Sequence, residues 1–226
     1  MIRLTRSMLA GALLLGLVAP AAAAATDAVP STRGLYLQLI SQARMDGRAR
    51  AALAYLDDFD LRYPDDPDAR LLRINSLLDL GDIDSAEMVA RLPADDRDQS
   101  MSLVRGHLHA ARGRWAEAIP FYQAATRAYP TDALPRNALG YAQLRAGQSA
   151  AAIETLRSAA DLAPGDTVIR NNLLLALTLG NQPAQAAALL DGMADPQARL
   201  LLSRQIAAEA AGIAAVPAPH AGKGNS

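Results

Sequence analysis

A repeat of about 34 residues runs through most of this chain of 226 residues. Five small residues or prolines return 34 positions later: Gly106, Gly113, Ala118, Ala125 and Pro130 are followed by Gly140, Gly147, Ala152, Ala159 and Pro164. Glycines at one place in each copy extend the series, with spacings of 34, 32, 34 and 33, at Gly47, Gly81, Gly113, Gly147 and Gly180. Because a unit this short cannot bury its apolar side chains alone, the period predicts stacked units that share a continuous core.

The pattern of each copy predicts two helices joined by a turn. In the third copy we expect helices at Gln99–Arg112 and Trp115–Tyr129, with Gly113 between them. Glycine adopts the left-handed conformation that ends a helix without steric cost, and the fixed φ and missing N–H of Pro130 stop the second helix. The chain is rich in alanine, the strongest helix former, and only 4% aromatic. The sequence therefore predicts an all-α protein with closely packed helices.

The residues at these positions resemble the tetratricopeptide repeat (TPR) family. The third copy carries the family's pattern at Gly106, Gly113, Trp115, Ala118, Tyr122, Ala125 and Pro130. The fourth copy carries it at Asn137, Ala138, Leu139, Gly140, Gly147, Ala152, Leu156, Ala159 and Pro164. The resemblance implies an all-α, right-handed superhelical solenoid of about five TPR helix-turn-helix pairs with a C-terminal capping helix. It is weakest in the second copy, whose second helix, about Asp84 to Leu92, is cut short by Pro93.

Composition shifts along the chain divide it into five parts. A signal peptide is expected at 1–25, a short linker at 26–32, the repeats at 33–194, a capping helix at 195–213 and a disordered tail at 214–226. The five repeats are expected at about 33–66, 67–98, 99–132, 133–166 and 167–194.

The N-terminal segment has the pattern of a secretory signal. Arg3 and Arg6 precede the apolar run Met8–Val18, and the small residues Ala21–Ala25 follow. The run is shorter than the roughly 20 residues that span a membrane, so an uncleaved anchor is the alternative and export to the periplasm is the main expectation. No later segment is long and apolar enough to cross a membrane. A lipoprotein signal needs a cysteine and the sequence has none, so we expect a soluble or peripherally associated protein.

Few residues suggest a catalytic, metal-binding or nucleic-acid-binding role. The chain has 22 lysines and arginines against 23 acidic residues, a net charge of −1, which argues against binding to nucleic acid. His107 and His109 are two residues apart on a helix and face different sides, so they cannot share a metal ion; the third histidine, His220, is in the tail. The aspartate clusters, such as Asp65–Asp66 and Asp82–Asp84, lie near helix ends and are expected to cap helices. No enzyme activity, metal or cofactor is predicted.

A groove along the first helices is the remaining candidate site. In the TPR family the first helices line a concave groove that holds a protein or peptide partner, and polar or aromatic side chains fill the matching positions of this chain. They are Asn75, His107, Asn137, Tyr141, Arg145, Asn171 and Asn172. An asparagine side chain both donates and accepts hydrogen bonds, as a peptide backbone requires. The alternative is that these asparagines only cap or solvate their helices.

Among exported TPR proteins, the chain is similar to TadD-type proteins, which assist the assembly of tight-adherence (Flp-type) pili. The similarity rests on the signal-like segment, the short array and the run Arg170–Leu177 (RNNLLLAL). It implies a non-catalytic scaffold whose partner is a pilus or secretion component. The alternative is a general periplasmic adaptor or chaperone in envelope biogenesis or cytochrome assembly.

Overall fold

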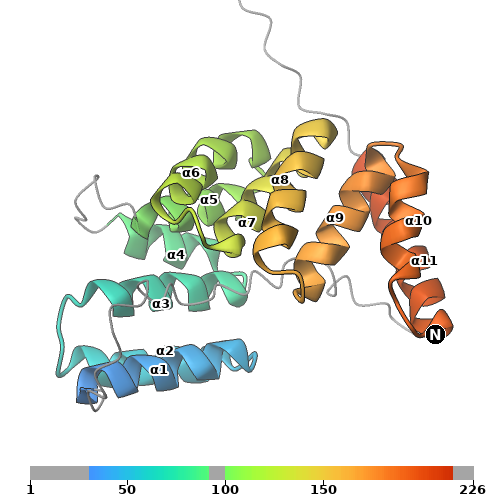
Figure 1. The fold of residues 1–226 in the computed structure, drawn as a ribbon. Helices are drawn as coiled ribbons and strands as arrows, with labels where there is room; N and C mark the ends of the chain where they lie inside the picture. The colour runs from blue at the N-terminus through green and yellow to red at the C-terminus, as the bar shows by residue number, and fades with distance from the viewer. Residues whose placement is uncertain (1–30, 92–99, 216–226) are drawn as a thin grey trace, which may run out of the picture. The chain divides into compact units, whose positions relative to one another are not determined.

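The computed structural model describes residues 31–91 and 100–215, and every regular element in these two stretches is a helix (Figure 1). The prediction of an all-α chain is therefore confirmed. The helices are α1 (Thr32–Met45), α2 (Ala49–Asp60), α3 (Pro67–Asp79), α4 (Ile83–Ala90), α5 (Ser100–Ala111), α6 (Trp115–Ala128), α7 (Ala133–Arg145), α8 (Ser149–Leu162), α9 (Thr167–Leu179), α10 (Pro183–Asp191) and α11 (Pro196–Ala214).

The helices form two compact units that meet in sequence between Ala128 and Tyr129. The first unit contains α1–α6 and the second contains α7–α11. Within each unit, consecutive helices pack as pairs: α1 with α2, α3 with α4 and α5 with α6 in the first, and α7 with α8 and α9 with α10 in the second. Each pair is one copy of the sequence repeat.

Four of the five predicted turn glycines adopt the left-handed conformation. Gly47, Gly81, Gly113 and Gly147 have φ angles of 73°, 75°, 71° and 81°. A residue with a Cβ would be strained in this backbone conformation. Their spacing sets the repeat, because each one ends a first helix and lets the chain reverse into the second.

The fifth turn differs from the prediction. Gly180 has a φ of −81°, and the left-handed residue is Asn181, with a φ of 52°. Asparagine tolerates this conformation better than most residues do. Gly147 and Asn181 are 34 positions apart, so the left-handed residue keeps the regular spacing although the two glycines are 33 positions apart. Gly180 has a packing role instead: a Cβ added there would lie 2.7 Å from Cδ1 of Ile153 on α8.

Aspartates begin most of the first helices, as the sequence predicts. Oδ1 of Asp66 accepts hydrogen bonds from the backbone N–H groups of Asp68 and Ala69 at 3.0 Å. Asp132 and Asp166 cap α7 and α9 in the same way. Such a cap satisfies N–H groups that a helix start leaves without partners and typically contributes about 1 kcal/mol. Not every aspartate cluster caps a helix, however: Asp57 and Asp60 lie within α2 and form ion pairs with Arg73.

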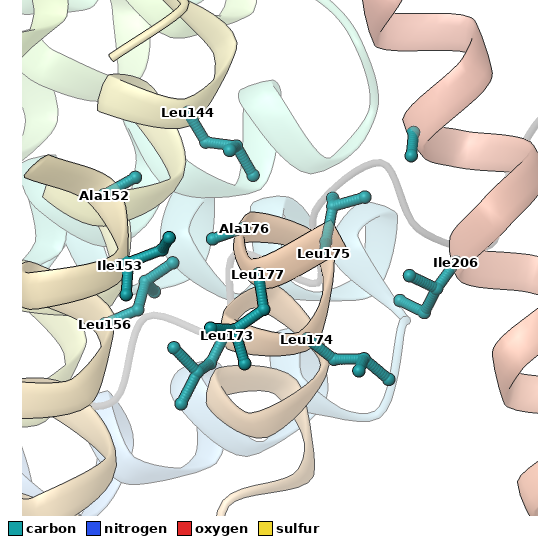
Figure 2. Packing of buried hydrophobic residues seen from close by; sticks show 11 residues of the cluster. Leu144, Ala152, Ile153, Leu156, Leu173, Leu174, Leu175, Ala176, Leu177 and Ile206 are labelled. Atoms are coloured by element: carbon teal, nitrogen blue, oxygen red, sulfur yellow. The ribbon is translucent and has the colours of Figure 1, made fainter. Parts of the chain in front are cut away.

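The main apolar cluster of the second unit contains residues of α7, α8, α9 and α11. The consecutive residues Leu173–Leu177 of α9 are all buried, against Ile153 and Leu156 of α8 on one side and Ile206 of α11 on the other (Figure 2). A helix that is apolar around most of its circumference must be covered on several sides. This explains why the run Leu173–Leu177 interrupts the usual alternation of apolar and polar faces.

Several predicted features lie outside the described residues. They are the signal peptide at 1–25, most of the linker at 26–32, the end of the second repeat with Pro93, and the tail from residue 216. Across residues 31–91 and 100–215, no helix combines the length and hydropathy that crossing a membrane requires. The predicted repeat boundaries stay predictions.

Candidate functional site

The seven candidate residues all lie on first helices. Asn75 of α3 and His107 of α5 belong to the first unit. The other five belong to the second unit, on α7 and α9: Asn137, Tyr141, Arg145, Asn171 and Asn172. The structure therefore places five of the seven on two helices of one unit.

Two of the candidate asparagines bind each other. The amide nitrogen Nδ2 of Asn172 donates a hydrogen bond to Oδ1 of Asn137 at 2.8 Å. The two residues are 35 positions apart and belong to adjacent first helices, α7 and α9. Asn172 is only 9% exposed, so this bond satisfies a polar group that would be costly to bury alone. The neighbouring Asn171 differs, because its Oδ1 is buried and accepts no hydrogen bond within the described residues.

Tyr141 stands at the centre of a second polar group. The guanidinium of Arg145 donates through Nη1 to the Tyr141 hydroxyl oxygen at 3.2 Å and lies 5.8 Å from the ring centroid. The hydroxyl in turn donates to Oε1 of Glu209 on α11 at 3.4 Å. Burial raises the pKa of Tyr141, so the phenol keeps its proton and remains a donor at neutral pH.

The two candidates in the first unit are buried rather than exposed to a partner. Asn75 is 6% exposed and His107 is 2% exposed. The imidazole of His107 packs beside Tyr122 of α6, with ring centroids 5.4 Å apart. Burial, together with the positive charge of Arg44, lowers the pKa of His107 to about 3, so the ring is neutral at physiological pH. The expectation of a solvated or groove-facing histidine therefore fails for His107, because a helix partner covers it.

Sequence reasoning missed two acidic partners, one in each unit. Nε of Arg44 on α1 donates to Oδ2 of Asp79 on α3 at 2.6 Å, and Glu209 binds Tyr141 as described. The signal that could have found Asp79 is spacing: Arg44 and Asp79 are 35 residues apart, as are Asn137 and Asn172. Complementary polar residues one period plus one position apart join neighbouring first helices of a unit.

The two histidines within the described residues do not share a site. His107 and His109 face different neighbours, since His109 stacks on Phe121 with centroids 5.1 Å apart. No group of three metal-ligating side chains occurs within the residues that the structure describes. What these faces do provide is a set of hydrogen-bonding groups on a rigid helical support.

Comparisons with known proteins agree with this architecture. The family model described as tetratricopeptide repeat matches residues 109–177. Among solved structures, a thermophilic TPR protein from Thermus thermophilus is 19% identical, with a TM-score of 0.63 over 82% of this chain and 100% of its own. MamA from residue 41 to its end, from Desulfovibrio magneticus RS-1, is 23% identical, with a TM-score of 0.55 over 79% of this chain and 98% of its own.

These matches support a TPR protein. At such identities the structural likeness shows the fold alone, a helical repeat solenoid. No curated protein matches the chain. TPR folds typically serve as non-catalytic scaffolds for protein–protein interaction, and the polar faces of α7 and α9 are suited to that use. The role of the individual candidate residues in binding stays a prediction.

Proposed function

We propose that this TPR protein is exported to the periplasm and acts there as a scaffold in the assembly of a tight-adherence (Flp-type) pilus or secretion system. Export is supported by the arginines and apolar run of the N-terminal segment. The pilus assignment is supported by the short array and by the run Arg170–Leu177. The partner would be a protein component of the pilus or secretion system.

The observation that carries the binding role is the polar face shared by α7 and α9. Asn137 and Asn172 hold each other across the two helices, and Asn171, next to Asn172 on α9, is partly exposed. Tyr141 and Arg145 add a donor and a positive charge on α7. Side chains fixed in this way lose little conformational freedom on binding, which favours affinity.

Gene deletion and complementation in the organism of origin test the proposal. We expect deletion to abolish surface fibres in electron micrographs and the intact gene to restore them. The double variant Asn137→Ala with Asn171→Ala should restore fewer fibres while its circular dichroism spectrum stays helical. Gln123→Ala is the matched control, because it removes an exposed amide from the second helix α6, and it should restore fibres fully.

Cell fractionation tests the compartment separately. The protein should leave the cell with the periplasmic fraction after osmotic shock, without its first 25 residues or so. Normal fibres in the deletion strain would refute the pilus role and favour a general envelope adaptor. Retention of the protein in the cytosolic fraction would refute export.

A further inference from the structure

We propose that the faces of α7 and α9 that meet α11 form a docking surface for an amphipathic helix, and that α11 fills this surface in the structure described above. The inference rests on the proposed scaffold function, and it names the kind of partner: a helix that replaces α11. The argument uses residues of the second unit only.

The packing of α11 on the preceding pair differs from that of α3 and α9. Of the helices in the preceding pair, α3 packs mainly on the second helix α2 and α9 mainly on the second helix α8, whereas α5 contacts the first helix α3 slightly more than the second helix α4. α11 packs chiefly on α9, a first helix, and only slightly on α10. Ile206 of α11 enters the apolar cluster that contains Leu174 and Leu175 of α9 (Figure 2), and Ala210 belongs to the same cluster. α11 therefore covers the first-helix side of the second unit.

A polar contact extends this cover to the preceding repeat. Glu209 of α11 accepts the hydrogen bond of Tyr141 on α7, although the two residues are 68 positions apart. Arg145 donates to the same hydroxyl group, so a carboxylate at the position of Glu209 lies near a positive charge. α11 thus occupies the place on α7 where the sequence predicts a partner.

α11 is held more loosely than the helix on which it rests. Only Ile206 and Ala210 of its 19 residues are buried, whereas seven of the 13 residues of α9 are buried. Its polar contacts are few: near its beginning Arg199 donates to Oδ1 of Asp191 at 2.9 Å and to the backbone oxygen of Met193 at 3.1 Å, and in its second half Glu209 accepts the bond from Tyr141. A helix with few buried residues and few polar contacts can detach while the rest of its unit stays folded.

The contacts of α11 define the chemistry of the competing helix. Its contact stripe follows the spacing of one helix face, with aliphatic side chains at Leu202, Ile206, Ala210 and Ile213. A carboxylate on the same side, as at Glu209, would accept the bond from Tyr141. We therefore infer an amphipathic partner helix with an aliphatic stripe and one acidic residue beside it, bound in a helix-on-helix groove.

Two variants of the full chain test the proposal with the same chemical change. Ala210→Glu places a charge in the buried contact, because Ala210 is 8% exposed, and it should release α11. Ala208→Glu places the charge on the exposed side of the same helix and is the control. The probe is a fluorescent peptide of residues 195–215, and its binding is measured by anisotropy.

We expect Ala210→Glu to bind the peptide about 30-fold more tightly than either the wild-type chain or Ala208→Glu, because a surface that is mostly occupied binds with correspondingly reduced apparent affinity. Equal binding by all three proteins would overturn the proposal. Because the experiment needs no pilus component, loss of the pilus role would leave its result unchanged.

Hydrogen exchange on the wild-type chain gives a second readout that does not depend on how a variant folds. The amides of residues 200–214 should exchange at least about tenfold faster than those of the buried segment 172–177, which shows that α11 opens separately. Exchange of both segments at one rate would make α11 an integral part of the unit and overturn the proposal. A concentration-dependent dimer that the peptide dissociates would assign the surface to a second copy of the chain and would also overturn it.

Discussion

The hairpins α5–α6 of the first unit and α7–α8 of the second unit solve one packing problem with different side chains. In both, a glycine of the first helix faces a large side chain of the second. A Cβ added to Gly106 would lie 2.5 Å from Cε1 of Tyr122, and one added to Gly140 would lie 2.5 Å from Cγ of Leu156. The repeat therefore keeps the gap between the helices, while the side chain that fills it varies between a flat ring and a branched aliphatic chain.

The residue that follows Gly106 or Gly140 also differs between the two hairpins. His107 is buried beside Tyr122, and its Nδ1 has no hydrogen-bond partner within the described residues. Tyr141, at the same place in the next copy, is half-buried and bonded to Arg145 and Glu209. One repeat position thus has a packing role in one unit and presents polar groups on a face in the other. Equivalent positions in the repeat do not imply equivalent functions.

The largest loss of stability is expected when the large side chain that fills each gap between the helices is removed. Tyr122→Ala should lower the free energy of unfolding by about 4 kcal/mol and Leu156→Ala by about 3 kcal/mol, since both side chains are fully enclosed and leave cavities. Urea titration followed by circular dichroism measures both values. Gln123→Ala, on the exposed side of α6, should cost less than about 0.5 kcal/mol. A loss below about 1 kcal/mol for either large residue would contradict the packing described above.

A pH titration compares His107 with Tyr141. The pKa of His107 is about 3 in the folded chain against an ordinary value of 6.5, so between these values only the unfolded chain takes up this proton. The corresponding stability is complete above pH 6.5 and decreases as the pH falls toward 3. From about pH 7.5 to about pH 5 the wild-type chain should therefore lose about 2 kcal/mol more than His107→Leu does.

The comparison with Tyr141 supplies the control for that titration. Tyr141→Phe should leave the pH dependence over the same range unchanged, because the raised pKa of Tyr141 keeps the phenol protonated throughout. Stability is read from urea titrations at each pH. Parallel curves for wild type and His107→Leu would contradict the burial of a neutral imidazole.

The smallest change in stability is expected when a methyl group is added at the glycine of one hairpin. Gly140→Ala should cost about 1 kcal/mol in the wild-type chain, because the clash with Leu156 exceeds the gain in helix propensity. In the Leu156→Ala background the same substitution should stabilise the chain by about 1 kcal/mol, since only the propensity gain remains. A double-mutant cycle measures this change of sign. Additive effects would show that Gly140 and Leu156 do not limit each other.

Most of the local architecture could be predicted from the sequence. The left-handed turns at Gly47, Gly81, Gly113 and Gly147 and the helix cap at Asp66 depend on a few neighbouring residues, so a pattern in the sequence is sufficient to find them. The fifth turn was misplaced by one residue because glycine is usually the better left-handed residue. In the structure Gly180 lies against Ile153, and the need for a close helix approach there outweighed that preference.

The candidate site was predicted less completely. The sequence placed Asn137, Tyr141 and Arg145 on one helix face, and the structure brings them together with Asn172 and Glu209. It did not predict that Asn75 and His107 are buried, nor that Asp79 pairs with Arg44. These facts depend on which side chain of a neighbouring helix lies opposite, and a repeat period alone does not specify that.

The sequence by itself determined the number of helix pairs, their turns and the small residues that let paired helices approach, because each follows from backbone preferences over a few residues and from a regular period. The tertiary structure alone decided which polar groups pair between helices and that α11 rests on α9. Those contacts join residues 35 and 68 positions apart. They form because folding brings these residues together and removes water from around them, so each buried polar group must find a partner or remain without one.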